Sequence, residues 1–180
     1  MRKGINRAIT SQYRSIYESA SYYSSKCVFI SHKSEDKEAA IWVAELLMKD
    51  GIDVYLDIND EGLQKATAEG NAKKIVECIE KAISVSTHIL VLITYKTKES
   101  WWVPYEVGYS KKANKHIASL LLKSVSDFPD YLKIERKLSG LSDLKKYSNE
   151  LQGTISHNES VNEIIEAVRI DRNLLTYIRV

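Results

Sequence analysis

The sequence predicts an α/β fold in which a parallel sheet is covered by helices on both faces. Two observations carry this prediction. Short apolar runs typical of buried strands alternate along the chain with stretches of helical periodicity. The most apolar run, His88 to Thr94 (HILVLIT), is continuous, which is typical of a strand buried on both faces. Strands that alternate with helices form right-handed βαβ units, and these units give a parallel sheet.

Local patterns predict the elements of the first half of the sheet. Residues 26–31 (KCVFIS) are apolar and β-rich and predict the first core strand. Ser34, in the polar stretch after that strand, is predicted to cap the next helix, and Gly51 is a natural residue to follow its end. Residues 52–57 (IDVYLD) predict the second strand. The buried stripe of the intervening helix consists of Ala39, Val43, Leu46 and Leu47.

The second half of the sheet begins with residues 59–71 (NDEGLQKATAEGN), which predict a long polar loop. Such loops inside compact domains are usually functional or disordered. Helical periodicity resumes over residues 75–83, ahead of the strand at 88–94. Residues 98–110 (KESWWVPYEVGYS) then predict a helix, and residues 117–122 (IASLLL) predict a fourth strand.

The two ends of the chain give weaker patterns. Residues 138–144 are compatible with a short last strand, and Ser160 with Glu163 forms a capping box ahead of a final helix. Near the N-terminus, apolar side chains recur on one helical face, at Ile5, Ile9, Tyr13, Ile16, Tyr17 and Ala20. We therefore expect a helical extension over residues 1–25 and the main domain over residues 26–180.

The composition excludes several classes of function. With 26 basic and 24 acidic side chains the net charge is +2, too near neutral to suggest a nucleic-acid binder. Cys27 and Cys78 lack a metal-type spacing and indicate a reduced, cytoplasmic location. The four histidines form no ligand pattern, so no metal site is expected. No run approaches the about 18 apolar residues of a membrane helix, so no membrane association is expected.

One carboxylate stands out in the segment at 98–110. Pro104 suits the first turn of a helix, where its missing N–H leaves no bond unmade. Glu106 would then lie in the same turn, just past the carboxyl end of a central strand. Ligands bind at that edge of open α/β sheets. The alternative interpretation is that Trp101 and Trp102 are core residues and that Glu106 offsets the helix dipole.

These motifs together resemble one family. Residues 28–36 (VFISHKSED) are similar to the opening strand and helix start of TIR (Toll/interleukin-1 receptor) domains, especially bacterial ones. Residues 51–57 (GIDVYLD) are similar to the second strand of these domains, and residues 59–71 correspond to their mobile BB loop. Residues 100–106 (SWWVPYE) resemble the segment that carries the catalytic glutamate in members that cleave NAD. The resemblance covers roughly residues 26 to 123.

The resemblance implies a flavodoxin-like parallel sheet of five strands. It also implies cleavage of the bond between nicotinamide and ribose in NAD, with Glu106 catalytic. NAD is then the substrate, and no cofactor is expected. The product would be ADP-ribose or a cyclic ADP-ribose-type signal, as in Thoeris-type anti-phage defence, where it activates a separate effector. In the family the loop at 59–71 often meets a neighbouring subunit, so self-association through TIR–TIR contacts is expected.

The chemistry of this cleavage explains why one carboxylate suffices. The nicotinamide of NAD is a cationic pyridinium and departs neutral, so no general acid is required. A fixed carboxylate can stabilise the positive charge that grows on the ribose carbon. Trp102, four residues before Glu106, lies on the same helical face and could stack on the pyridinium or on adenine. The expected substrate-binding residues are Ser31, His32, Lys33, Trp102 and Tyr105, with Tyr105 supporting Glu106. Core packing is the alternative for Trp102 and the favoured interpretation for Trp101.

Two other functions stay open. The first is a non-catalytic TIR adaptor that acts only by TIR–TIR assembly, which would have no need of Glu106. The second is a nucleoside deoxyribosyltransferase-like enzyme, which shares the sheet and uses a glutamate nucleophile, although the opening motif at 28–36 disfavours it. Two departures from the family pattern also matter. Residues 59–71 lack the Gly-Asp/Glu pattern of many enzymatic members, and residues 1–25 have no family counterpart.

Overall fold

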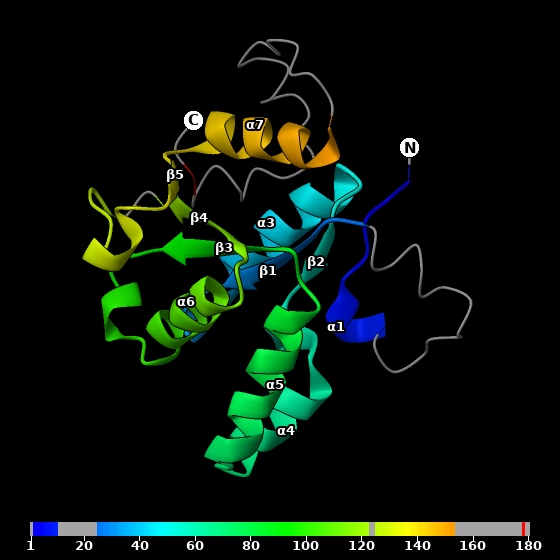
Figure 1. Cartoon of the computed structure of the whole chain (residues 1–180), viewed down its shortest axis with the longest axis vertical. Helices are drawn as coiled ribbons and strands as arrows, with labels where there is room; N and C mark the ends of the chain where they lie inside the picture. The colour runs from blue at the N-terminus through cyan, green and yellow to red at the C-terminus, as the bar shows by residue number, and fades with distance from the viewer. Residues whose placement is uncertain (1, 11–24, 123–124, 154–177, 179–180) are drawn as a thin grey trace.

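The computed structural model describes residues 2–10, 25–122, 125–153 and 178 (Figure 1). Within these residues, five parallel strands form one sheet in the order β2-β1-β3-β4-β5. The strands are β1 (Cys27–Ser31), β2 (Asp53–Tyr55), β3 (His88–Ile93), β4 (His116–Leu121) and β5 (Arg136–Leu138). The helices are α1 (Arg7–Thr10), α3 (Lys37–Lys49), α4 (Glu61–Ala68), α5 (Ala72–Ser84), α6 (Trp102–Lys112) and α7 (Leu141–Gln152). The predicted α/β fold class is confirmed.

Helices cover both faces of the sheet. Helices α3 and α7 lie on one face, and α5 and α6 lie on the other (Figure 1). Because side chains alternate along a strand, Val28 and Ile30 of β1 pack toward α3, while Cys27 and Phe29 pack toward α5 and α6. All six residues of β3 are buried, as the unbroken apolar run predicts.

The strand order places a ligand crevice at one edge of the sheet. The chain runs from β1 outward to β2 and then crosses back to β3 on the other side of β1. The order therefore reverses between β1 and β3, whose carboxyl ends are aligned by the pairing of Ser31 with Val91. Crevices at such switch points are where open α/β sheets bind their ligands.

The predicted loop at residues 59–71 is wrong, because most of it is helix α4. Asp60 caps this helix, with its Oδ1 accepting from the backbone N–H of Leu63 at 3.1 Å. Leu63 and Ala66 are buried, three residues apart on one face. The helix is only eight residues long and its other side chains are mostly exposed, so the sequence shows little periodicity.

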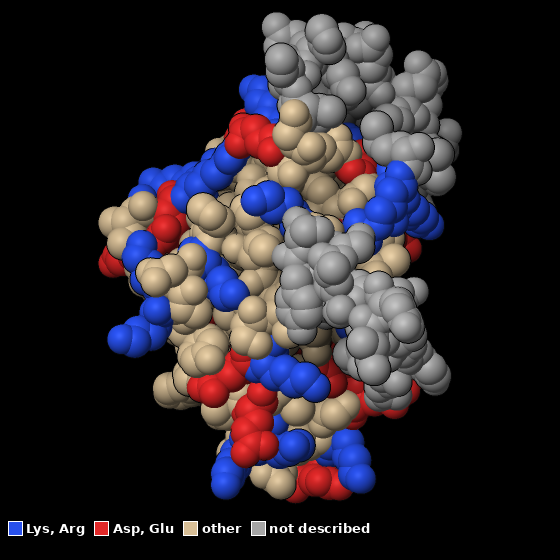
Figure 2. Space-filling model, turned by 45° about the vertical axis from the view of Figure 1, so that its right-hand side comes forward, with Lys and Arg blue, Asp and Glu red and all other residues tan. Residues whose placement is uncertain are grey.

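Charged pairs stabilise the α4–α5 hairpin on its exposed sides. Lys65 and Glu69 lie one helical turn apart, as do Lys74 and Glu77, and each pair forms an ion pair. Basic and acidic side chains lie interspersed on the face that Figure 2 shows. Exposed pairs of this kind contribute only about 0.3–0.5 kcal/mol each, so packing of α5 on the sheet carries most of the stability.

Several smaller predictions also need correction. The last strand ends at Leu138, and Leu141 and Leu144 belong to α7, where both pack into the core. Ser34 lies inside a short 3-10 turn, η2 (Ser34–Asp36), and its side chain makes no capping bond. Gly51 follows the end of α3 with a φ of 82°, as predicted. The predicted final helix around Ser160 and Glu163 lies outside the described residues.

The N-terminal helix begins later than predicted. It begins at Arg7 rather than Ile5, and residues 11–24 lie outside the described part of the chain. Ile5 is in an extended stretch that pairs with β2, and Ile9 is 53% exposed, so the expected apolar stripe is not buried here. The buried residues are instead Asn6, Arg7 and Ala8. Across the described residues, no helix is long and apolar enough to cross a membrane.

Candidate functional site

A pocket of about 520 Å³ lies at the carboxyl ends of β1 and β2, between α4, α5 and the start of α6. Its polar wall includes His32 and Lys33 after β1 and Asp57 after β2. Its apolar wall is formed by Leu63 of α4 with Ile75 and Ile79 of α5. Trp101, Trp102 and Glu106 complete it from α6 and the residue before it. The pocket has the size and the mixed lining of small-molecule sites.

Glu106 is a buried carboxyl group in this pocket, with only 5% of the residue exposed. It is the fifth residue of α6, so it lies in the second turn and not, as predicted, in the first. Its burial and its distance from the helix start weaken the interpretation that it offsets the helix dipole. The hydroxyl of Ser31 donates to its Oε2 at 2.5 Å. Ser31 ends β1, fully buried, so the strand fixes the carboxyl group in place.

The environment of Glu106 favours its neutral form. Burial, together with the nearby charge of Asp57, raises the pKa of Glu106 from 4.5 to about 8, against the lowering effect of the Ser31 hydrogen bond. Within the described residues, no Lys or Arg forms an ion pair with Glu106. The carboxyl group is therefore poised to gain a cationic partner.

Asp57 is a second acid of the pocket, and sequence reasoning missed it by placing it at the end of a strand. It opens a 3-10 turn, η3 (Asp57–Asn59), directly after β2. Burial raises its pKa as well, although the His32 ring lowers it. Its Oδ1 is buried without a hydrogen-bond donor among the described residues, 3.7 Å from His32 Nδ1. A carboxylate at the end of a strand that borders a switch point is the signal that could have revealed it.

His32 and Lys33 lie where the sequence predicted, at the end of β1, and both line the pocket. Nδ1 of His32 lies 3.2 Å from the carbonyl oxygen of Ile30, which fixes the orientation of the ring. Lys33 forms an ion pair with Glu35 at 3.6 Å. Lys37, in the first turn of α3, also lines the pocket and gives this wall a second amino group.

The two tryptophans differ in burial. Trp102 is 39% exposed and lines the pocket together with Glu106, as its four-residue spacing predicts. Trp101 was expected in the core, but it is 91% exposed beside the pocket. The reason is that Trp101 precedes α6, so its side chain projects from the helix start rather than from the buried face that holds Val103 and Val107.

Tyr105 is not brought into the pocket. Its hydroxyl donates to Glu80 of α5 at 2.6 Å, and this bond raises the pKa of Tyr105 to about 12. Tyr105 thus ties α6 to α5, and it carries no part of the proposals below. The described residues contain no group of three or more His, Cys, Asp or Glu side chains that could hold a metal ion.

Comparison with known proteins decides the family. A family model of the TIR domain matches residues 28–153, from β1 to the end of α7. This chain belongs to the TIR domain family. The match covers well over half of the 180 residues, and the strand order of this TIR domain agrees with it. A comparison with curated proteins finds no match. TIR domains commonly self-associate, and some of them cleave NAD.

Proposed function

We propose that this TIR domain cleaves the bond between nicotinamide and ribose in NAD, with Glu106 as the catalytic residue. The observation that carries the proposal is the buried carboxyl group of Glu106 in a pocket of about 520 Å³, held by one hydroxyl and forming no ion pair with a Lys or Arg of the described structure. A buried carboxylate that lacks a cation favours a positively charged ligand. The pyridinium of NAD is such a ligand.

The reaction needs one carboxylate. As the bond to the ribose carbon breaks, its electron pair goes to the pyridinium nitrogen, and nicotinamide departs neutral. Positive charge then develops on the ribose carbon, where the carboxylate of Glu106 stabilises it. The cationic ring also lowers the pKa of Glu106 from its unliganded value of about 8, so that binding itself favours the ionised form. Ser31 holds the carboxyl group in position.

The walls of the pocket suit the other parts of a dinucleotide. Lys33 and Lys37 supply the positive charge that a diphosphate requires. Leu63, Ile75 and Ile79 form an apolar wall for a flat base. Trp102 can stack on a base, and cation–π attraction to a pyridinium contributes about 0.5–2 kcal/mol.

The product is proposed to be a cyclic ADP-ribose-type signal in preference to free ADP-ribose. A pocket closed by a second copy of the chain excludes water, and a tethered base or hydroxyl then attacks the ribose carbon in its place. Specific activity should consequently rise with protein concentration. The biological role proposed for such a product is Thoeris-type antiviral defence, in which a separate effector binds the nucleotide. Mass spectrometry distinguishes the two products by one water.

A second candidate function is a non-catalytic adaptor that acts through TIR–TIR assembly. The observation that favours it is Trp101, which is 91% exposed next to the pocket. Large exposed aromatic side chains are enriched where proteins meet partners. The two functions are compatible, because a partner that contacts Trp101 would also close the pocket.

The decisive experiment is incubation of the purified protein with NAD and measurement of nicotinamide by chromatography. Glu106→Gln keeps the shape and removes the charge, so we expect a loss of at least about 10³-fold in turnover. Glu99→Gln is the matched control, because Glu99 lines the same pocket but is exposed, and it should stay within about threefold of the wild type. Full activity of Glu106→Gln would exclude Glu106 as the catalytic residue. If the wild type released no nicotinamide at any protein concentration, the adaptor function would be favoured instead.

A further inference from the structure

The described N-terminal segment, residues 2–10, lies along the outer edge of β2 (Figure 1). The backbone N–H of Val54 donates to Ile5 at 2.9 Å, and Asn6 pairs with Val54 in a parallel bridge. The fit is close at Gly4, where an added Cβ would lie 2.0 Å from the carbonyl oxygen of Ile52. This segment therefore continues the sheet beyond β2 and covers an edge that would otherwise expose unpaired backbone groups.

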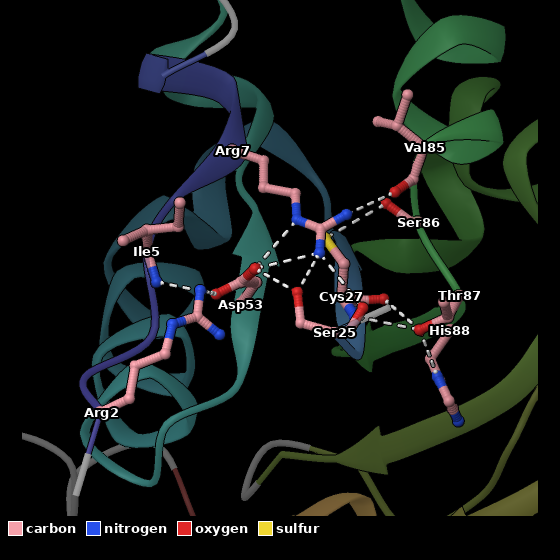
Figure 3. A network of polar contacts seen from close by, with 10 residues as sticks. All are labelled: Arg2, Ile5, Arg7, Ser25, Cys27, Asp53, Val85, Ser86, Thr87 and His88. Carbon is pink, nitrogen blue, oxygen red and sulfur yellow. Dashed lines mark hydrogen bonds and ion pairs between the residues drawn. The ribbon is translucent and has the colours of Figure 1, made fainter. Parts of the chain in front are cut away.

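A buried ion pair between Arg7 and Asp53 anchors the segment (Figure 3). Asp53 begins β2, so this ion pair lies at the amino end of the strand, whereas the pocket lies at the carboxyl end. Both Nε and Nη2 of Arg7 donate to Asp53 Oδ2, at 3.1 and 3.0 Å. Nη1 donates to the carbonyl oxygen of Val85 at 3.0 Å, and Nη2 also reaches Ser25. Arg7 thus bonds to residues at or just before the starts of β1, β2 and β3. These bonds hold the residues beside Arg7 firmly against the sheet.

Asn6 extends this anchorage toward the pocket. Its Oδ1 accepts from the backbone N–H of Leu56 at 3.2 Å and from that of Ala8 at 3.1 Å. Its Nδ2 donates to Asn59 Oδ1 at 2.9 Å. Leu56 and Asn59 are the residues just before and at the end of turn η3, which carries Asp57. One buried side chain thus holds both ends of the turn that places Asp57 in the pocket.

We infer that Asn6 is a positioning residue of the site, which keeps Asp57 beside Glu106 by holding both ends of turn η3. The inference deepens the NAD-cleaving function proposed above and rests on it for its kinetic consequence. It assigns a role to a segment that lies ahead of the residues matched by the TIR family model. Nothing else in the described structure bonds to the side chain of Asn59, and Asp57 Oδ1 has no hydrogen-bond donor. The carboxyl group of Asp57 accepts from backbone N–H groups of its own turn, at Asp57 and Ile58, so its position depends on where the turn is held.

The consequence for the pocket follows from electrostatics. Asp57 is one of the two causes that raise the pKa of Glu106. A turn that loosens lets Asp57 move out and water move in, and both changes lower the pKa of Glu106. The other titratable side chains that line the pocket are His32, Lys33, Lys37 and Glu99. Asn6 forms no hydrogen bond with any of these in the described structure, so its replacement acts through the turn.

The test compares Asn6→Ala with Arg2→Ala in the full chain. Arg2 belongs to the same segment and donates to Asp53 at 2.7 Å, but in the described structure it forms no hydrogen bond with the turn. The first readout is the pKa of Glu106, followed by NMR on protein with ¹³C-labelled glutamate side chains. The second is kcat and KM for nicotinamide release. We expect Asn6→Ala to lower the pKa of Glu106, and the rise of kcat/KM with pH should move to lower pH with it, because the carboxylate is the proposed active form.

Arg2→Ala should change neither readout, because it leaves the turn in place. A pKa of Glu106 that is unchanged in Asn6→Ala, or lowered equally in Arg2→Ala, would overturn the inference. Should Asn6→Ala fail to fold, Asn59→Ala removes the same bond from the exposed side and must lower the pKa in its place. The NMR readout needs no turnover, so an inactive wild type would refute the proposed function while the role of Asn6 is still decided.

Discussion

Two buried acids at opposite edges of the sheet, Asp53 and Glu106, have contrasting surroundings. Asp53 is completely buried at the start of β2, and Glu106 is 5% exposed at the carboxyl end of the sheet. Asp53 Oδ1 accepts from Arg2 and from the backbone N–H of Ile5, and its Oδ2 accepts from Arg7 and Ser25. Among the residues that the structure describes, Glu106 accepts only from Ser31.

The difference separates a structural acid from the acid that we propose to be catalytic. Two guanidinium groups and further donors replace the water that Asp53 loses on folding, so its burial ties the N-terminal segment to the sheet (Figure 3). Glu106 loses its water without receiving a cation, which is costly for folding and useful for binding one. Incomplete satisfaction of a buried charge is a mark of sites that a ligand completes.

The largest expected effect comes from removing the cation on the structural side. Arg7→Met should destabilise the fold by about 3–5 kcal/mol, because it leaves Asp53 buried with its charge only partly compensated. Urea denaturation gives this value. Arg2→Met is the matched control, since the Arg2 side chain is 50% exposed, and it should cost about 1 kcal/mol or less. Replacement of both Arg7 and Asp53 by apolar residues should recover part of the loss, and equal effects of Arg7→Met and Arg2→Met would contradict the comparison.

Isosteric changes at the two acids should alter the free energy of unfolding in opposite directions. Folding raises the pKa of Glu106 from 4.5 to about 8, so the wild type loses stability as the pH rises through this window. Glu106→Gln abolishes that loss, and above pH 8 it should be more stable than the wild type, by on the order of 3 kcal/mol. Asp53→Asn should instead be destabilising at pH 7, because Arg7 then faces no charge.

Urea denaturation of the wild type and both variants from pH 5 to pH 9 checks these signs. Near pH 5 the wild type and Glu106→Gln should have similar stabilities, because Glu106 is neutral in the folded protein there. A destabilised Glu106→Gln at pH 9 would show that the carboxylate has a partner that compensates its charge.

The sequence indicated Glu106, the acid proposed to be catalytic, but not the structural acid Asp53. Glu106 could be found because a buried strand, a proline and a helix follow one another along the chain, so local patterns place it at the carboxyl edge. The four-residue spacing between Trp102 and Glu106 is likewise a local pattern. Asp53 could not be recognised, since its partners Arg7 and Ser25 are 46 and 28 residues away. Only the folded sheet brings these residues together.

The same reasoning explains the errors. Helix α4 was missed because only Leu63 and Ala66 are buried in it, too few to show a period. The role of Asn6 depends on the register in which residues 2–10 meet β2, and no local pattern contains that register. Asp57 looked like the end of a strand because η3 is a single turn. Long-range pairing thus decided the case of Asn6, whereas α4 and η3 are too short to show a periodic pattern.

The smallest expected effect sharpens the functional side of the comparison. Asp57→Asn removes the second cause of the raised pKa of Glu106 and leaves burial, the larger cause, in place. The pKa of Glu106 should therefore fall, but by less than burial raises it. If the carboxylate is the active form, kcat/KM in the wild type rises with pH through about 8, the value for the free protein. In Asp57→Asn this rise should move to lower pH, while in Glu99→Gln, where the charge removed is exposed, it should stay where it is. A rise that stays at the wild-type pH in Asp57→Asn would mean that burial alone sets the pKa of Glu106, and that Asp57 serves the pocket only by contact with the ligand.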